Sequence, residues 1–348
     1  MDLELDVDTV RGGDNARSLY DSSGYGRPLD GGLSLSLVEA AYLLYHGDVD
    51  EIDGMDLGEF VAYASDLMDG FYLTFMVYRD LRERGLYLQN LPSQRKIEVY
   101  PRGVLPQEGD PEYIVRAAGE ASLLGGDELD DVVGVLDDGG DVTYFEVSRW
   151  DSDDGTLQYG DTPEPGGGEL ELEPVGKRYF VTHHGEEGGN PEHLHKRLFY
   201  GAEEPGGWFL SPEEVRYLNR CTGIDVTVSS SDQDGNGAGV PGLKTGIEED
   251  DGQDLELRLG VYSDLRDRGL CPKTGFKYGA EFRVYETVED VEDLPHSSFL
   301  VQVLPESYVF DPKEVSRAAR LAHGVKKTMV FALAGDGVRY LAVERFRP

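Results

Sequence analysis

Short runs of alternating apolar and polar residues recur along the chain, and they predict strands. The four clearest predicted strands lie in the last quarter of the chain, at residues 282–285, 299–303, 329–333 and 338–343. Alternation with a period of two places every second side chain on the same face of a strand. The strands at 282–285 and 299–303 show this alternation, and those at 329–333 and 338–343 are the two closing strands.

Between the predicted strands, apolar residues follow helical spacing. A helix is predicted at residues 255–268, where Gly269 provides the usual left-handed end, and another from Pro312 to about Gly324. Ser211 begins a further helix, because a serine cap is followed by a proline and two acidic residues. This mixture of elements predicts an α/β (mixed α+β) fold, in which helices flank the sheets.

The pattern occurs twice. Residues 77–86 read Val-Tyr-Arg-Asp-Leu-Arg-Glu-Arg-Gly-Leu and match residues 261–270, Val-Tyr-Ser-Asp-Leu-Arg-Asp-Arg-Gly-Leu. Upstream, Leu35-Ser36 and Glu39 correspond to Leu210-Ser211 and Glu214, and downstream Val99-Tyr100 corresponds to Val284-Tyr285. Self-similarity of this kind indicates one fold written twice. We predict a tandem duplication, with copies at about 1–172 and 177–348.

Composition and spacing suggest boundaries within each copy. The first copy should divide into an N-terminal subdomain at about 1–70 and a second subdomain at 71–160. Residues 161–176, rich in proline, glycine and glutamate, are predicted to be a linker. The second copy should divide at residue 252, so that it has subdomains at 177–251 and 252–348. Residues 229–253 lack periodicity and are predicted to be an acidic surface loop.

The chain is strongly acidic, with 68 Asp and Glu against 32 Lys and Arg and a formal net charge of −36. Carboxylates spread along a surface keep a protein hydrated in concentrated salt, so we predict a protein of a salt-loving cytoplasm. The charge is uneven, because residues 252–348 hold 14 basic and 15 acidic residues whereas residues 1–251 hold 18 and 53. An anionic partner is therefore expected to bind the last quarter.

The chain has two cysteines, Cys221 and Cys271, which are too few for a zinc cluster and argue against a fold held together by disulfides. The sequence has no window of about 18 apolar residues, and no apolar stretch follows a basic start. We expect a soluble protein of the cytoplasm. His183, His184, His193 and His195 form a group that could bind a metal, although their acidic, glycine-rich setting argues against it.

Residues suited to RNA cleavage without a metal lie in three segments of the last quarter. Attack by the 2′-hydroxyl needs a base, an acid for the leaving 5′-oxygen, and a cation for the charged phosphorane. Histidine is the natural acid near neutral pH, and lysine suits the phosphate. A tyrosine can act as the base only if neighbouring cations lower its pKa, and Lys277, Arg283 and Lys326 are close enough in sequence to do so.

Each of these residues taken alone has a structural explanation. Tyr285 could be a half-buried core aromatic, His296 a capping or surface residue, and Lys327 a cation that complements the end of a helix. His323, in the same helix, reads as structural. Taken together, the three segments are far more specific.

They resemble those of the archaeal tRNA-splicing endonuclease family. Residues 273–285 read Lys-Thr-Gly-Phe-Lys-Tyr-Gly-Ala-Glu-Phe-Arg-Val-Tyr, His296-Ser297 follows, and residues 320–327 read Arg-Leu-Ala-His-Gly-Val-Lys-Lys. The resemblance implies a restriction-endonuclease-like catalytic domain at 252–348, which needs no metal or other cofactor. It cuts precursor tRNA at a bulge–helix–bulge element and leaves 2′,3′-cyclic phosphate and 5′-hydroxyl ends.

The resemblance also implies roles for individual residues. Tyr285 would be the general base, His296 the general acid and Lys327 the cation of the transition state, with Lys326 left open as the alternative lysine. Two arginines would clamp a bulged base. Arg320 matches the first, and Arg345 is our choice for the second, with Arg347 also open.

The first copy keeps Tyr100 but has no histidine between His46 and His183 and no lysine between Lys96 and Lys177. It is therefore predicted to be a degenerate structural copy. The resemblance implies a homodimer, in which an acidic loop around Asp137, Asp138 and Asp141 docks on the opposing subunit. From the residues alone, this segment reads as a hairpin turn.

Two other functions stay open. One is a catalytically inactive RNA-binding or structural subunit of a splicing endonuclease. The other is a metal-dependent nuclease of the same wider fold, for which Glu281 and Glu286 would be the candidate carboxylates.

Overall fold

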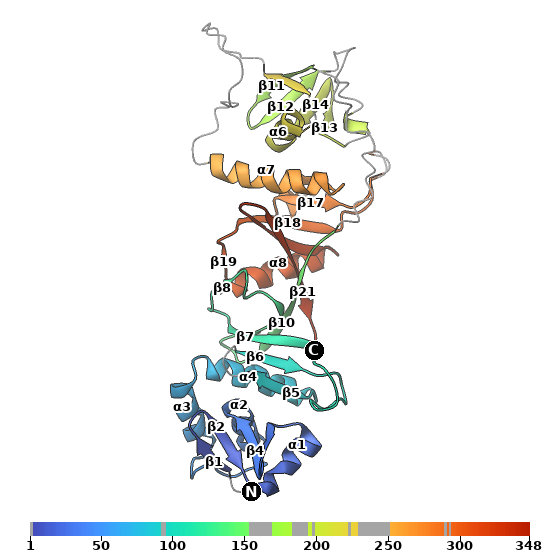
Figure 1. Cartoon of the computed structure of the whole chain (residues 1–348). Coiled ribbons are helices and arrows are strands. Elements are labelled where there is room, and N and C mark those ends of the chain that lie inside the picture. The colour runs from blue at the N-terminus through green and yellow to red at the C-terminus, as the bar shows by residue number, and fades with distance from the viewer. Residues whose placement is uncertain are drawn as a thin grey trace. The chain divides into compact units, whose positions relative to one another are not determined.

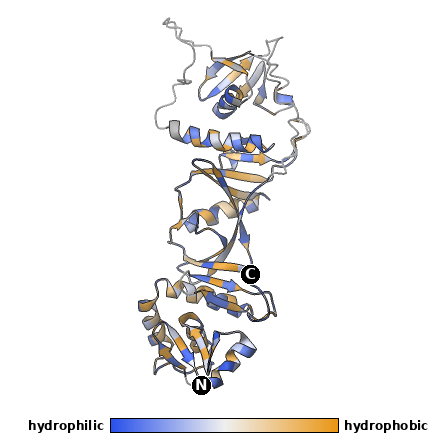
Figure 2. Cartoon of the chain, viewed as in Figure 1, coloured by the Kyte–Doolittle hydropathy of each residue, from blue (hydrophilic) through white to orange (hydrophobic). Residues whose placement is uncertain are grey.

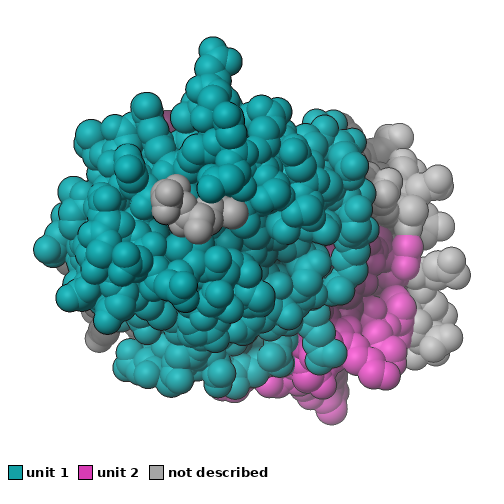
Figure 3. All heavy atoms as spheres, turned by 90° about the horizontal axis from the view of Figure 1, so that it is seen from below, with its two compact units in different colours: residues 1–148, 309–320, 343–348 teal, residues 149–308, 321–342 magenta. Residues whose placement is uncertain are grey.

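The computed structural model describes residues 3–91, 95–152, 169–182, 194–196, 199–221, 224–228, 251–288, 291 and 294–348 (Figure 1). The chain forms two compact units, coloured separately in Figure 3. The first unit comprises Met1–Ser148, Val309–Arg320 and Val343–Pro348, and the second comprises Arg149–Tyr308 and Leu321–Ala342. Of the described part of the chain, no helix is long and apolar enough to cross a membrane.

The first unit begins with a four-stranded antiparallel sheet in the order β1-β2-β4-β3. Its elements are β1 (Leu3–Asp6), β2 (Thr9–Gly12), η1 (Asp14–Ala16), α1 (Arg17–Ser23), β3 (Arg27–Leu29), β4 (Gly32–Ser36), α2 (Leu37–His46) and α3 (Leu57–Leu67). Ser36 caps α2, because its hydroxyl accepts the Glu39 backbone N–H at 3.2 Å while the Glu39 carboxylate accepts the Ser36 N–H at 2.9 Å. The start of α2 is thus fixed by local sequence.

The remainder of the first unit is a helix on a sheet of order β5-β6-β7-β9-β10. The elements are α4 (Phe71–Glu83), β5 (Leu88–Leu91), β6 (Lys96–Val99), β7 (Tyr113–Gly119), β8 (Leu124–Gly125), β9 (Asp131–Leu136) and β10 (Val142–Arg149). Strands β7 and β9 are parallel, and the other neighbours are antiparallel. A turn at residues 137–141 joins β9 to β10, so the predicted hairpin is confirmed.

The second unit has a five-stranded sheet in the order β13-β14-β12-β11-β15. Its elements are β11 (Glu169–Val175), β12 (Arg178–Thr182), β13 (Ala202–Glu204), β14 (Gly207–Leu210), α6 (Pro212–Cys221) and β15 (Asp225–Val228). The predicted linker at residues 161–176 is therefore wrong for its last part. Glutamates alternate there with Leu170 and Leu172, which are buried, so the segment has the period-two pattern of a strand despite its glycine-rich approach.

Further strands follow one another in the order β16-β17-β18-β20-β21. The elements are α7 (Asp251–Asp267), β16 (Cys271–Thr274), η3 (Phe276–Tyr278), β17 (Phe282–Tyr285), β18 (Phe299–Pro305), β20 (Thr328–Ala334) and β21 (Val338–Phe346). Strand β19 (Val309–Phe310), helix α8 (Pro312–Gly324) up to Arg320, and the end of β21 from Val343 belong to the first unit. In Figure 2 strands such as β18 are largely hydrophobic, whereas α7 carries both kinds of residue. The four predicted strands and both helices are confirmed. Strands β18, β20 and β21 extend beyond their predicted ends, whereas α7 begins before its predicted start and ends one residue earlier than predicted. Helix α7 starts inside the predicted loop 229–253, and residues 229–250 lie outside the described part.

Several hydrogen bonds of the first unit have a counterpart in the second. The Arg82 Nε donates to the Tyr78 hydroxyl at 3.2 Å, and the Arg266 Nε donates to the Tyr262 hydroxyl at 2.9 Å. The Glu39 carboxylate accepts the backbone N–H groups of Gly26 and Ser36, as Glu214 accepts those of Gly201 and Ser211. The internal sequence match therefore corresponds to a match in packing.

Candidate active site

Strand β17 positions Tyr285, which lies opposite Cys271 of β16. The Tyr285 side chain is buried and belongs to a small cluster with Phe199 and Cys271. Its ring meets that of Phe199 edge to face, with 5.9 Å between the centroids. Tyr285 is thus at the predicted place on the strand, but inside an apolar pocket.

This environment changes the acidity expected of Tyr285. Burial raises the pKa of its phenol, and Arg283, whose guanidinium carbon lies 5.5 Å from the ring centroid, only partly opposes the rise. The charges on Cys271 and Tyr278 act in the same direction as burial. The prediction that neighbouring cations lower the Tyr285 pKa is therefore wrong, because desolvation outweighs them.

The expected cationic field instead acts on Tyr278, in η3. The hydrogen bond and charge of Lys277 hold the pKa of this phenol below its usual value, and the charges of Lys327 and Arg283 add to the effect. The ammonium groups of Lys277 and Lys327 lie 4.8 and 5.6 Å from the ring centroid of Tyr278. Sequence reasoning missed Tyr278, although the three cations around it lie in the segments already identified.

Lys327 lies just after α8. Lys326 has a left-handed backbone (φ 57°) that ends the helix, and the Lys327 N–H donates to the Ala322 carbonyl at 2.9 Å. The Lys327 ammonium donates to the Ser297 hydroxyl at 2.7 Å and also to the Ser297 carbonyl. Partial burial lowers the Lys327 pKa. Lys326 is exposed, so of the two lysines the geometry favours Lys327 for a role in this site.

The same contact places His296 at the site. Ser297 is buried, whereas His296, its neighbour, is exposed to solvent. The segment is held from the other side as well, because the Ser298 N–H donates to the Val284 carbonyl at 3.1 Å and its hydroxyl donates to Glu286 at 2.5 Å. The segment that carries this exposed imidazole is thus held between β17 and the end of α8.

The candidate base-clamping arginines lie on other elements. Arg320, on α8, is exposed, and its guanidinium donates to the Ser316 hydroxyl at 3.1 Å. Arg345, near the end of β21, and Arg347, beyond it, are also exposed. All three belong to the first unit, whereas Tyr285, His296 and Lys327 belong to the second.

The residues considered as metal ligands either form hydrogen bonds within the protein or lie outside the described part. The Glu281 carboxylate accepts the Val303 N–H at 3.0 Å, and burial raises its pKa. Glu286 accepts the Ser298 hydroxyl. In the described ranges no three His, Cys, Asp or Glu residues form a group that could hold a metal ion. Of the histidine group only His195 is described, and its Nδ1 lies 2.8 Å from the Tyr200 carbonyl.

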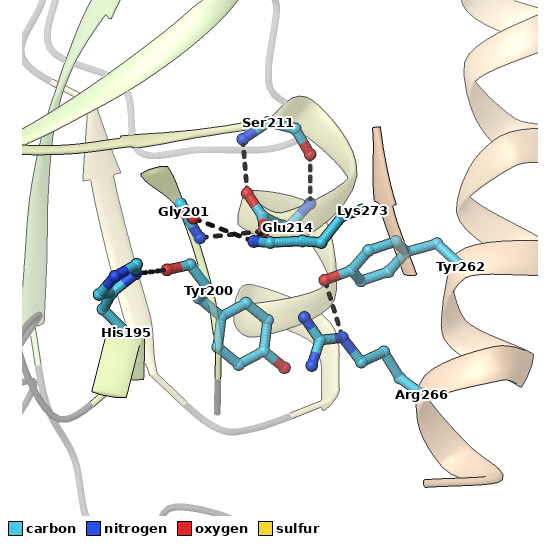
Figure 4. Close-up of polar contacts among 8 residues, drawn as sticks. All are labelled: His195, Tyr200, Gly201, Ser211, Glu214, Tyr262, Arg266 and Lys273. Atoms are coloured by element: carbon cyan, nitrogen blue, oxygen red, sulfur yellow. Dashed lines mark hydrogen bonds and ion pairs between the residues drawn. The ribbon is translucent and has the colours of Figure 1, made fainter. Parts of the chain in front are cut away.

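A buried polar network joins Lys273 to Glu214 (Figure 4). The Lys273 ammonium lies 2.7 Å from the Glu214 carboxylate, and it donates to the Gly201 carbonyl at 3.0 Å. Burial raises the Glu214 pKa, but the Lys273 charge and the hydrogen bonds from Lys273, Ser211 and Gly201 outweigh it and leave the pKa lowered. Lys273 also lies 4.6 Å from the ring centroid of Phe199, the residue that contacts Tyr285. The motif that contains Lys273 could be recognised in the sequence, whereas its ion-pair partner Glu214, 59 residues away, could not.

Two family models match parts of this chain. Residues 255–340 match the family model for the catalytic C-terminal domain of tRNA intron endonuclease, and residues 1–61 match the model for its N-terminal domain.

Curated relatives match over the whole chain. The tRNA-splicing endonucleases of Haloarcula marismortui and Natronomonas pharaonis are both 38% identical, over 365 and 362 positions, with all of each chain covered. That of Methanosarcina mazei is 35% identical over 365 positions, which cover 100% of this chain and 99% of the relative. The presence of halophilic archaea among the relatives agrees with the acidic composition. The chain belongs to the tRNA-splicing endonuclease family.

Proposed function

We propose that this protein excises introns from precursor tRNA by cutting both strands of a bulge–helix–bulge element without a metal ion. The 2′-hydroxyl attacks the adjoining phosphate, so the products carry a 2′,3′-cyclic phosphate and a 5′-hydroxyl. The observation that carries the proposal is the contact of Lys327 with Ser297, because it joins the end of α8 to the segment that presents His296.

Each of the three groups has one task in this reaction. His296 is accessible and protonates the leaving 5′-oxygen as general acid. Lys327 stabilises the additional negative charge of the phosphorane. Tyr285 removes the proton of the 2′-hydroxyl, and since burial raises its pKa, binding of RNA must open its pocket or bring the hydroxyl to it.

The direct test compares wild type with His296→Ala on a labelled bulge–helix–bulge RNA, in concentrated potassium chloride with EDTA. We expect wild type to release products with cyclic phosphate ends and the variant to lose about 10²- to 10⁴-fold in single-turnover rate. His323→Ala is the matched control, because His323 is also exposed and is given no part in the reaction.

Two results would contradict the proposal. A folded wild type that binds the RNA but does not cut it would favour the inactive RNA-binding or structural subunit. Cleavage that stops in EDTA and returns with a divalent ion would favour the metal-dependent nuclease.

We further propose that the chain is a tandem duplication, in which each copy has an N-terminal subdomain and a restriction-endonuclease-like subdomain, and that only the second copy is catalytic. The Glu112 N–H donates to the Val99 carbonyl as the Ser298 N–H donates to that of Val284. Counting from this bond, Asp110 stands where the second copy has His296. Val115 pairs with Val132 as Val301 pairs with Val330, so Leu129 stands where the second copy has Lys327. Only Tyr100 remains of the three groups.

We propose that the guanidinium groups of Arg320 and Arg345 stack on the two faces of a bulged base. Arg347 is the alternative to Arg345. Guanidinium groups stack on bases and need no particular sequence. Arg320→Ala is expected to weaken RNA binding more than the chemical step. Unchanged binding with slow cleavage of bound RNA would contradict this role, and separate Arg345→Ala and Arg347→Ala variants identify the second arginine.

Finally, we propose that the protein acts in the cytoplasm as a homodimer, with the loop of Asp137, Asp138 and Asp141 docked on the partner subunit. All three side chains are exposed, although the Asp137 carboxylate also accepts the N–H groups of Gly139 and Asp141 and shapes the turn. Asp138→Lys combined with Asp141→Lys keeps Asp137 and should halve the mass measured by light scattering. An unchanged dimer mass would exclude this loop as the contact.

A further inference from the structure

Phe276 is the most exposed large apolar side chain of the described part, with 88% of its surface open to solvent. It is the first residue of η3 and precedes Lys277 and Tyr278. A single exposed apolar side chain is ordinary on a protein surface, so the exposure of Phe276 gains meaning only from the groups beside it. The folding of this chain does not explain it.

The backbone holds Phe276 in this position. The Gly275 N–H donates to the Glu281 carbonyl at 2.9 Å, and the Tyr278 N–H donates back to the Gly275 carbonyl at 2.7 Å. A Cβ at Gly275 would lie 2.7 Å from the Ala280 carbonyl oxygen, so only glycine allows this close turn. Gly279, with φ 69°, completes the loop. The ring is therefore displayed on a closed turn.

The charges that act on Tyr278 of η3 are all positive and come from Lys277, Lys327 and Arg283. No described carboxylate forms an ion pair with Lys277, Arg283 or Lys327, although the whole chain has a net charge of −36. Lys277 and Lys327 both lie against the ring of Tyr278, and Lys327 binds Ser297 next to His296. An aromatic face beside unpaired cations is the combination with which proteins hold unpaired nucleotides.

We propose that Phe276 stacks on an unpaired base of the RNA and that Lys277 binds a phosphate beside that base. This inference rests on the proposed function and adds to it a second base-binding place, separate from the arginine pair. The occupant is a nucleotide of the bulge close to the bond being cut, because η3 adjoins Lys327 through Tyr278. Stacking depends little on salt, so such a contact suits a protein that binds a polyanion in concentrated salt.

The test uses a bulge–helix–bulge RNA that carries 2-aminopurine in the bulge. A 2′-deoxy nucleotide at each cut site leaves it bound but uncut. Phe276→Ala should weaken binding about 5- to 150-fold, since one stacked base contributes about that much, and should abolish the stacking-induced quenching of 2-aminopurine. Phe276→Trp should retain both. Val175→Ser is the matched control, because Val175 is an exposed apolar residue of the same unit and should change neither.

The dependence of binding on salt separates the two contacts. Lys277→Ala should reduce the slope of log affinity against log potassium by about 0.7 to 0.9, the contribution of one phosphate contact. Phe276→Ala should leave the slope unchanged while lowering affinity at every salt concentration. Circular dichroism confirms that each variant is folded.

The possible failures are distinct. If wild type cuts the ribose form of the RNA and Phe276→Ala binds and quenches as wild type does, the stacking inference is overturned and the proposed function stands. If Phe276→Ala changes only the mass measured by light scattering, Phe276 faces a second copy of the chain and the inference is again wrong. If wild type neither binds nor cuts the RNA, the proposed function falls and the inference with it.

Discussion

The surroundings of Tyr100 in the first unit and of Tyr285 in the second differ in charge, although their backbones are paired alike. Tyr100 donates a hydrogen bond to Glu98 at 3.1 Å, and burial together with the charges of Glu98 and Asp110 raises its pKa to about 12. Burial also raises the pKa of Tyr285. A cation opposes the rise in both places, Arg27 at Tyr100 and Arg283 at Tyr285, but carboxylates add to it only at Tyr100. The residue aligned with His296 is the acidic Asp110.

This difference shows that the scaffold and the chemistry are separable. Leu129, at the position of Lys327, is buried, so the first unit has a core residue where the second has a cation. Replacing Leu129 with lysine would bury an unpaired charge and would not create a site. At this position the first unit therefore lacks both a cation and the polar surroundings that a cation would need.

The largest expected effect concerns a polar network that the units do not share. Glu214 has Lys273 as its ion-pair partner, whereas the residue of β5 at the Lys273 position is Gln89, and no described cation pairs with Glu39. Glu214→Gln would leave Lys273 buried without its anion and should cost about 3 to 5 kcal/mol of unfolding free energy. Glu39→Gln weakens hydrogen bonds to a charged group and should cost about 1.5 to 3 kcal/mol.

Urea unfolding in concentrated potassium chloride measures the loss in Glu214→Gln. Trp150 and Trp208, the only tryptophans, both lie in the second unit and report on it, and hydrogen exchange reports on the first. Adding Lys273→Met to Glu214→Gln should restore part of the loss. Equal costs for Glu214→Gln and Glu39→Gln would show that the ion pair adds nothing.

The pH dependence of this effect has a definite sign. Because the Glu214 pKa is lowered on folding, its contribution to stability is complete above the ordinary carboxyl pKa of about 4.3 and is lost as the pH falls through the lower folded value. The difference between wild type and Glu214→Gln should therefore be constant near neutral pH and shrink below about pH 4. A difference that grows on acidification would contradict the lowered pKa.

The second largest effect is expected on the cleavage rate, at the position where the second unit has Lys327 and the first has Leu129. Lys327→Ala should slow single-turnover cleavage by about 10²- to 10³-fold, the usual effect of removing one group that stabilises transition-state charge. Lys326→Ala is the matched control and should cut at nearly the wild-type rate, because its side chain points to solvent from a left-handed residue. The reverse order of the two variants would move the role to Lys326.

Much of the second unit could be predicted from sequence, because its information is local. Strand β17 has the predicted ends, and the cap of α6 forms as the Ser211-to-Glu214 spacing indicates. The strand Glu169–Val175 was missed, since glycine and glutamate dominate the composition while only two buried leucines carry the pattern. Local spacing thus succeeded where side chains repeat and failed where composition concealed the repeat.

Prediction of the candidate site from sequence was limited by something else, the electrostatics. Its residues were found through motifs, and the structure joins two of those segments through Lys327 and Ser297. The acidity of Tyr285 was predicted in the wrong direction, because sequence proximity to cations was visible whereas burial by Phe199, 86 positions upstream, was not. Electrostatics depends on desolvation, and desolvation depends on long-range packing.

The smallest expected effect tests a pair of bonds that the units do share. The Tyr144 hydroxyl donates to Asp80 at 2.6 Å, and the Tyr340 hydroxyl donates to Asp264 at 2.7 Å; each aspartate also accepts from an arginine. Tyr144→Phe and Tyr340→Phe should each cost about 1.5 to 3 kcal/mol, since each removes one hydrogen bond to a charged acceptor. Hydrogen exchange in each unit measures the two costs on one scale, and Tyr72→Phe, at an exposed tyrosine, should change stability by less than about 0.5 kcal/mol. Equal costs would mean that the units remain alike in energy wherever they are alike in geometry; a much smaller cost in the first unit would mean that its scaffold has weakened along with its chemistry.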